Sequence, residues 1–69
     1  MPHIEISMYP GRDENTKKDF AEKLRDFAAE TLNVPKSAFS VSIKDVPKSE
    51  WAEHIKKYSE ETFFVKNEM

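Results

Sequence analysis

The sequence predicts an α+β fold: a single βαβ unit with two parallel strands and one long helix, followed by a short C-terminal helix and a tail. Two segments in which apolar and polar residues alternate flank one segment in which apolar residues recur every three or four positions. The chain has 69 residues, which suits one domain covering residues 1–69. It contains no cysteine, so disulfides cannot reinforce such a small core. We therefore expect the unit to be assembled into a homo-oligomer.

The first predicted strand covers residues 3–9. Ile4, Ile6 and Met8 fall on one face of this segment, and polar residues occupy the other. The dipeptide Pro10-Gly11 ends the strand, because both residues favour turns.

A helix is predicted from about residue 13 to residue 32. Asp13 is a suitable N-cap, because its carboxylate can accept hydrogen bonds from the free N–H groups of the first turn. Asn33 suits the C-terminal end, and Pro35 prevents continuation. The three- and four-residue spacings that indicate the helix are those of Phe20, Leu24, Phe27, Ala28, Thr31 and Leu32.

The second predicted strand covers residues 39–45, with Phe39, Val41 and Ile43 on one face. A strand, a helix of roughly 18 residues and another strand form a βαβ unit, in which the strands are parallel and the crossover is right-handed. Two strands leave open edges and one bare face, which is a second reason to expect a partner subunit.

A short C-terminal helix is predicted around Trp51. Ser49 is a suitable N-cap for it, and Trp51, Ile55 and Tyr58 are spaced to lie on one face. The helix therefore presents two aromatic side chains to the rest of the domain or to a partner.

Composition excludes several classes of function. With 13 acidic and 11 basic residues the net charge is -2, so the chain lacks the cationic face that nucleic acids require. The longest apolar run, Phe63-Phe64-Val65 in the tail 59–69, is far shorter than the ~20 residues that span a bilayer. No signal peptide is visible, so we expect no membrane partner and a cytoplasmic location. Two histidines far apart and no cysteine are a poor basis for a metal site.

Pro2 is the first candidate functional residue. A small side chain at position two normally allows removal of Met1, which would leave a free secondary amine at the start of a strand. An α-amine titrates near ~7.7–8.0, and desolvation or a nearby cation lowers that pKa. A pKa close to the working pH is what a general base needs. The competing interpretation is that proline is common at this position and has no function there.

The order of these features resembles the 4-oxalocrotonate tautomerase family. The resemblance covers roughly residues 2–57 and is carried by Pro2-His3-Ile4-Glu5-Ile6, Pro10-Gly11-Arg12, the long helix, Pro35, the second strand and Trp51. It implies a tautomerase that uses no metal or cofactor, with Pro2 as the general base. It also implies that Arg12 binds the substrate carboxylate and that Trp51 forms an aromatic wall.

One position departs from the family pattern. Where the family has a second arginine, at the start of the second strand, this chain has Ser40. A reacting carbonyl would then lack a guanidinium donor, which argues against diacid substrates. Trp51, water or a main-chain group are the possible substitutes. The implied substrates are small 2-keto acids in their enol forms.

Strand geometry separates these candidate residues. Pro2 and Tyr9 are the two ends of one strand and lie about 23 Å apart at ~3.3 Å per residue. Arg12 and Trp51 follow the far ends of two parallel strands. A two-fold axis that pairs strands antiparallel would bring Pro2 of one subunit to Arg12 and Trp51 of another. A homodimer is favoured by the resemblance, and a hexamer is the alternative.

Each candidate also has a purely structural interpretation. Arg12 can be a solvated turn residue, and Trp51 can be a packing anchor. His3 is interpreted as a strand residue near the site. His54 is expected to be exposed or to contact Tyr58.

Two other functions are compatible with the same sequence. One is a non-enzymatic oligomeric interaction module, and the other is a dehalogenase or decarboxylase of the same superfamily. Retention of Met1 would exclude the tautomerase mechanism, because the nitrogen of Pro2 would then be an amide with no basicity.

Overall fold

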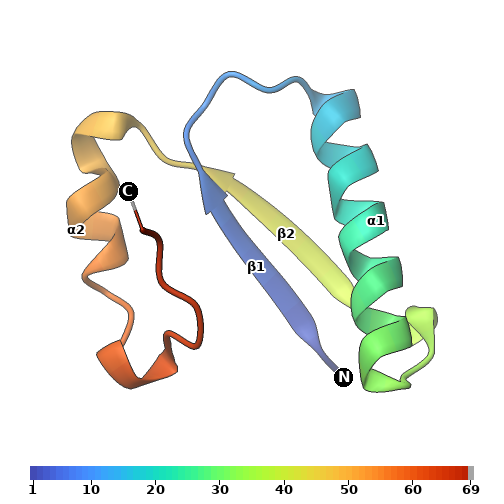
Figure 1. Cartoon of the computed structure of the whole chain (residues 1–69). Helices are drawn as coiled ribbons and strands as arrows, with labels where there is room; N and C mark the ends of the chain where they lie inside the picture. The colour runs from blue at the N-terminus through green and yellow to red at the C-terminus, as the bar shows by residue number, and fades with distance from the viewer. Residues whose placement is uncertain (69) are drawn as a thin grey trace.

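The computed structural model describes residues 1–68 and has the predicted α+β architecture (Figure 1). Within these residues no helix combines the length and the apolar character needed to cross a membrane. In chain order the elements are β1 (His3–Met8), α1 (Glu14–Leu32), the 3-10 turn η1 (Lys36–Ala38), β2 (Ser40–Asp45), the 3-10 turn η2 (Lys48–Glu50), α2 (Trp51–Ile55) and the 3-10 turn η3 (Glu60–Thr62).

The two strands pair in parallel, as predicted, in a register that sets His3 opposite Ser40 and Met8 opposite Asp45. Because side chains alternate along each strand, this register produces one apolar face and one polar face. The apolar face carries Ile4, Ile6, Val41 and Ile43, and the polar face carries His3, Glu5, Ser7, Ser40, Ser42 and Lys44.

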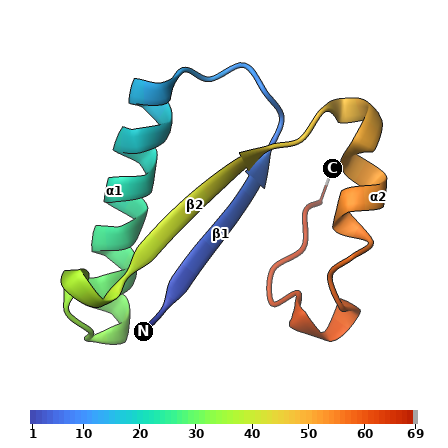
Figure 2. The same ribbon diagram turned by 180° about the vertical axis from the view of Figure 1, so that it is seen from behind.

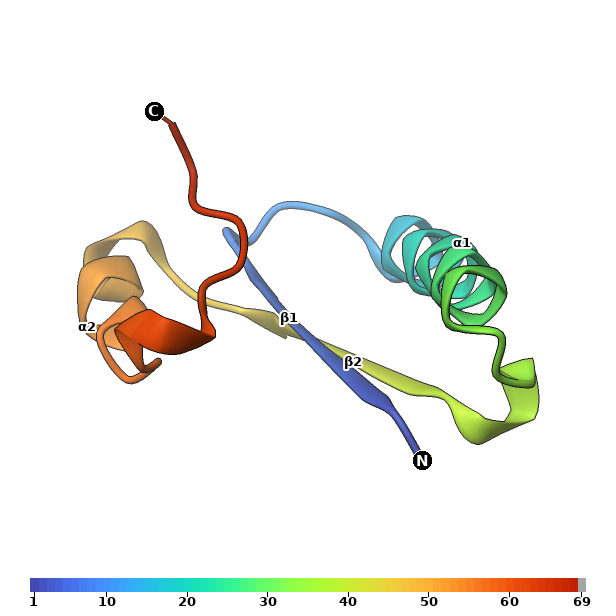
Figure 3. The ribbon, with the colours of Figure 1, turned by 60° about the horizontal axis from the view of Figure 1, so that its bottom comes forward.

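The helices lie on opposite sides of the strand pair. Helix α1 runs along one side and α2 with the tail along the other, as Figures 1 and 2 show from front and back and Figure 3 shows from below. An ion pair of 3.0 Å between Lys17 and Asp45 joins α1 to β2. The hydroxyl of Tyr58 donates to Glu5 at 2.8 Å and joins the tail to the polar face.

Both predicted ends of α1 are confirmed. Asp13 Oδ1 accepts a hydrogen bond of 2.8 Å from the Thr16 N–H, and this bond lowers the pKa of the Asp13 carboxyl. Asn33 adopts the left-handed conformation (φ 57°), which is common for the residue that ends a helix. Its N–H is donated to carbonyls of the last turn, so the end of the helix is hydrogen-bonded.

The prediction that Ser49 caps the second helix is wrong. Pro47 already turns the chain, the Glu50 N–H donates to its carbonyl at 2.9 Å, and Ser49 lies inside the resulting 3-10 turn. No side chain caps η2 or α2. Helix α2 is also shorter than expected, so Tyr58 lies beyond its end.

The core is very small. Among the described residues only Ala29 and Val46 are buried, with 6% and 3% of their surface exposed. On α1, Phe27 and Leu32 are 69% and 60% exposed, so much of the predicted apolar face of this helix has no cover within the chain.

The whole chain is also less compact than its length predicts. Its accessible surface of 5961 Å² is about 1,500 Å² larger than the ~4,500 Å² expected for a folded monomer of this mass. Its radius of gyration of 13.5 Å exceeds the ~11 Å expected for 69 residues. The single chain therefore exposes surface that a compact domain of this size would bury.

Candidate active site

Pro2 lies immediately before β1 and is half-buried. Its carbonyl oxygen accepts a hydrogen bond of 3.2 Å from the Ser40 N–H, which extends the β-pairing by one residue. Met1, in contrast, is fully exposed. The hydrogen bond with Ser40 anchors the backbone of Pro2 to the sheet, directly before β1 begins at His3.

Arg12 lies in the loop between β1 and α1, next to Gly11, whose φ of 131° is in the left-handed region that favours glycine. The guanidinium is exposed, and its polar contact is the weak acceptor Met8 Sδ at 3.9 Å. Within residues 1–68 no carboxylate lies within ion-pair distance of it, whereas Arg25, the other arginine, is paired with Asp26 at 3.0 Å. Arg12 is therefore a permanent cation that is free to bind an anion.

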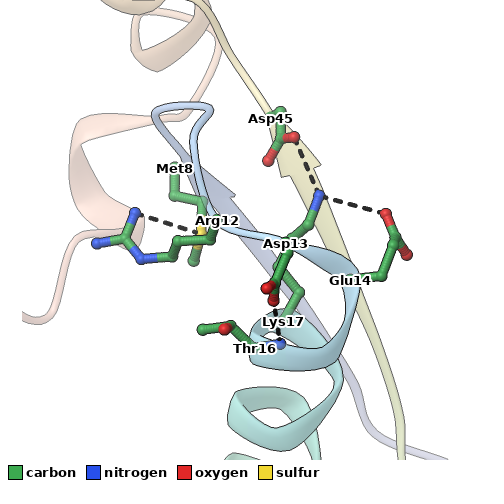
Figure 4. Close-up of polar contacts among 7 residues, drawn as sticks. All are labelled: Met8, Arg12, Asp13, Glu14, Thr16, Lys17 and Asp45. Atoms are coloured by element: carbon green, nitrogen blue, oxygen red, sulfur yellow. Dashed lines mark hydrogen bonds and ion pairs between the residues drawn. The ribbon is translucent and has the colours of Figure 1, made fainter.

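Lys17, in the first turn of α1, is already paired with carboxylates. Lys17 bridges Asp45 at 3.0 Å and Glu14 at 3.7 Å, and the hydrogen bond with Asp45 raises the pKa of the Lys17 ammonium. Figure 4 shows the Arg12 guanidinium pointing away from this chain of charges. An anion that binds near this loop would therefore interact with the guanidinium of Arg12 rather than with the ammonium of Lys17.

Trp51 begins α2 and packs edge-on against Tyr9, with ring centroids 5.0 Å apart at 78°. It also lines a hollow of about 250 Å³ between the polar face of β1 and the C-terminal segment. The other residues that line this hollow are Glu5, Ser7, Ile55, Tyr58, Thr62 and Phe63.

Two side-chain hydrogen bonds hold the C-terminal segment over this hollow. Tyr58 donates to Glu5, and Ser7 Oγ lies 2.7 Å from His54 Nε2. His54 also packs edge-on against Tyr58, with centroids 5.7 Å apart. The predicted contact between the last two residues is thus confirmed, and His54 is half-buried rather than exposed.

The structure places the predicted site residues at two ends of the strand pair. Pro2 precedes β1, and Arg12 and Trp51 lie beyond its other end, about 20 Å away for six residues at ~3.3 Å each. Arg12 lines a separate hollow, with Met8, Thr16, Lys17 and Phe20, and Trp51 does not line it. Within one chain the predicted site residues Pro2 and Arg12 therefore do not meet.

The bond between Tyr58 and Glu5 gives a prediction about alkaline pH. This bond raises the pKa of the Tyr58 hydroxyl, because the neutral hydroxyl can donate to the carboxylate and the phenolate cannot. The closure it stabilises is therefore complete below the ordinary tyrosine pKa of about 10 and is lost as the pH rises through the raised value. We expect the fluorescence of Trp51, the single tryptophan, to report this opening above pH ~10.

The matched variants for this titration are Tyr58→Phe and Tyr9→Phe. Tyr58→Phe should show the open-state emission already at neutral pH, whereas Tyr9→Phe, which keeps the bond to Glu5, should retain the closed-state emission. If Tyr58→Phe and the wild type have the same emission throughout the titration, the bond does not hold the segment closed.

The contacts of the polar face have no local signal in the sequence. The hydrogen bonds of His3 to Ser40 and Ser42, and of Glu5 to Tyr58, join residues that are 37 to 53 positions apart. The alternation of each strand identified the faces, but the register between strands was needed to pair them. Within residues 1–68 no three His, Asp or Glu side chains are grouped so that they could hold a metal ion.

A βαβ unit that begins directly after a proline and carries an arginine beyond its first strand has the features on which the resemblance to a family of small isomerases rests. Comparison with known protein families matches residues 2–60 to the family described as "Tautomerase enzyme". The chain belongs to the tautomerase family, as the resemblance implied, and is therefore an enzyme of the isomerase class.

Individual relatives agree with this assignment. A probable tautomerase of Xylella fastidiosa is 33% identical over 55 residues, which cover 80% of this chain and 67% of the relative. A 2-hydroxymuconate tautomerase of Comamonas testosteroni is 39% identical over 51 residues, covering 74% and 81%. A probable tautomerase of Bacillus cereus is 35% identical over 52 residues, covering 75% and 85%.

Proposed function

We propose that this protein interconverts the enol and keto forms of small 2-keto acids, with the N-terminal amine of Pro2 as the general base once Met1 has been removed. In ketonisation the amine takes the proton of the enol hydroxyl and delivers it to the neighbouring carbon. The O–H bond breaks, a C–H bond forms, and the C=C bond becomes the C=O bond. The proton returns to the carbon skeleton, so this scheme requires no metal or cofactor.

The observation that carries the proposal is the unpaired guanidinium of Arg12 in a chain whose first strand begins directly after Pro2. An arginine can bind a carboxylate through two parallel hydrogen bonds, which fixes the orientation of the substrate as well as its charge. A cation near the proline amine also lowers the pKa of that amine, which keeps it unprotonated and able to act as a base.

We further propose that the working form is a homo-oligomer, a homodimer or alternatively a hexamer, in which Arg12 and Trp51 of one subunit complete the site at Pro2 of another. The excess surface of about 1,500 Å² supports association, since a standard interface buries about 800 Å² on each partner. The separation of Pro2 from Arg12 supports a site shared between subunits.

The substrate is proposed to carry a single carboxylate next to an apolar group. Arg12 is the cation available for the carboxylate, and Ser40 stands where the family has a second arginine. The aromatic wall around Trp51 suits an apolar or aromatic substituent. We place the enzyme in the cytoplasm, where 2-keto acids of this kind occur as soluble metabolites.

The test is the rate of ketonisation of an enolpyruvate by the wild type and by Pro2→Ala, after intact mass has shown that Met1 is absent from both. Pro2→Ala should lower kcat/KM by at least ~10-fold, because a primary amine replaces the secondary amine and the strand loses a fixed dihedral angle. Pro35→Ala, which changes a proline in the connection between α1 and β2 and leaves the N-terminal amine intact, is the control and should retain the rate. Equal rates for the wild type and Pro2→Ala would refute the proposed mechanism.

A further inference from the structure

The polar face of the strand pair carries a cluster of three exposed side chains beside Pro2. The imidazole Nδ1 of His3 lies 2.6 Å from Ser40 Oγ, and its Nε2 lies 3.0 Å from Ser42 Oγ. The parallel register creates this arrangement, because Ser40 is opposite His3 and Ser42 is the next residue of β2 on the same face. These three side chains form the His3–Ser40–Ser42 cluster.

The cluster has one hydrogen-bond donor left over. A neutral imidazole carries one N–H and each serine carries one O–H, which makes three donor hydrogens for two hydrogen bonds. The ring N–H is donated to one serine, and the other serine donates to the bare ring nitrogen. The remaining hydrogen is therefore a hydroxyl hydrogen in both neutral tautomers, and it is free for a ligand. It belongs to Ser40 when Nδ1 carries the ring hydrogen and to Ser42 when Nε2 carries it.

The position of the cluster relates this donor to Pro2. Ser40 is the residue of β2 whose N–H binds the Pro2 carbonyl, and His3 is the next residue along β1. Glu5, the carboxylate on the same face of β1, accepts its hydrogen bond from Tyr58. Within residues 1–68 no carboxylate is hydrogen-bonded to the cluster, so none takes up the spare hydroxyl hydrogen.

We propose that the cluster binds the reacting oxygen of the substrate, with Ser40 as the donor and His3 as the residue that positions it by donating its Nδ1–H to Ser40 Oγ. This inference rests on the proposed function, in which Pro2 transfers a proton between that oxygen and the neighbouring carbon. Negative charge develops on the oxygen during the transfer, and a fixed O–H donor stabilises it. A neutral donor thus stands where the family has its second arginine, so the site selects monocarboxylates over dicarboxylates.

The kinetic test compares Ser40→Ala with Ser42→Ala, both of which remove one exposed hydroxyl from β2. Ser40→Ala should lower kcat by roughly 10-fold with little change in KM, because the lost interaction forms mainly in the transition state. Ser42→Ala, one step further from Pro2, should have a smaller effect. An unchanged kcat in Ser40→Ala, or equal losses that follow equal drops in melting temperature, would overturn the proposal.

Substitutions of His3 test its positioning role. His3→Phe, which keeps a flat ring without donors, should reproduce the kcat loss of Ser40→Ala. His3→Gln should restore part of it, because an amide N–H can donate to a serine hydroxyl. A His3→Gln variant as slow as His3→Phe would argue against positioning by hydrogen bonds.

A binding measurement keeps the cluster testable if the enzyme mechanism fails. Addition of pyruvate, as a small 2-keto acid, should shift the imidazole NMR signals of His3 in the wild type and not in Ser40→Ala. Equal ketonisation rates for wild type and Pro2→Ala would refute the proposed function alone. Absence of the His3 shift in the wild type would refute the cluster as an oxygen-binding site.

Discussion

Retention of Met1 should abolish most of the ketonisation activity, with a fall in kcat of ~10²–10⁴-fold, the usual contribution of a general base. The nitrogen of Pro2 then belongs to a tertiary amide, whose lone pair is delocalised into the carbonyl and cannot accept a proton at neutral pH. In such a chain the nearest free amine is that of Met1, which lies one residue before Pro2 and is fully exposed. An amine displaced by ~3.8 Å and not held by the sheet cannot replace the fixed one.

The same molecules can be measured before and after trimming. Protein that retains Met1, as shown by intact mass, is assayed, treated with a methionine aminopeptidase and assayed again. The rate should rise with the fraction of trimmed chains, while circular dichroism and oligomer size stay constant. Full activity in chains that retain Met1 would exclude Pro2 as the base.

The fold was predictable because its strands and its long helix are long enough for the spacing of their apolar residues to be recognised in the sequence. Residues 3–9 and 39–45 were predicted as strands, and the observed strands are one residue shorter at one end of each. The helix predicted for 13–32 was found with both expected end residues. These segments depend on local chemistry, namely alternation, capping and turn-forming residues, which the sequence displays directly.

The C-terminal segment was less predictable because its structure depends on contacts distant in sequence. Ser49 has the right chemistry for an N-cap, but Pro47 had already turned the chain. Tyr58 is placed by its bond to Glu5, and α2 is too short to position it. No local sequence pattern indicates such a bond, because its partners are 53 residues apart.

The candidate site likewise combines residues that the sequence indicates with contacts that depend on how distant segments pair. The resemblance to the family implied Arg12 and Trp51 as site residues, and Pro2 was indicated both by the resemblance and by its place directly before the first strand. The His3–Ser40 contact required the register, which the sequence does not determine because the β1 and β2 alternation is compatible with shifts of two residues. The separation of Pro2 from Arg12 followed from strand length alone. Under the proposed function, a second chain that covers exposed surface would also complete the site.

Mixing two impaired variants should restore activity if the site is shared between subunits. Arg12→Ala alone should lower kcat/KM by roughly 10²-fold, because charge-assisted hydrogen bonds to the substrate carboxylate contribute ~1.5–3 kcal/mol. In a dimer that joins Pro2→Ala to Arg12→Ala, one of the two sites receives an intact Pro2 from one chain and an intact Arg12 from the other. Random pairing of equal amounts makes half of the dimers mixed, so about a quarter of all sites regain both residues.

The experiment unfolds and refolds the two variants together, with each variant refolded alone as the control, and measures kcat/KM for an enolpyruvate. Recovery to about a quarter of the wild-type rate is expected for a dimer with one shared site per Pro2. Mixing Pro2→Ala with Pro2→Ala/Arg12→Ala should give no recovery beyond the residual rate of Pro2→Ala, because no chain then supplies an intact proline. If the first mixture merely averages the rates of its two parents, Pro2 and Arg12 do not act across an interface, and either each chain works alone or Arg12 does not bind the substrate. The oligomer would then bury the exposed surface without building the site.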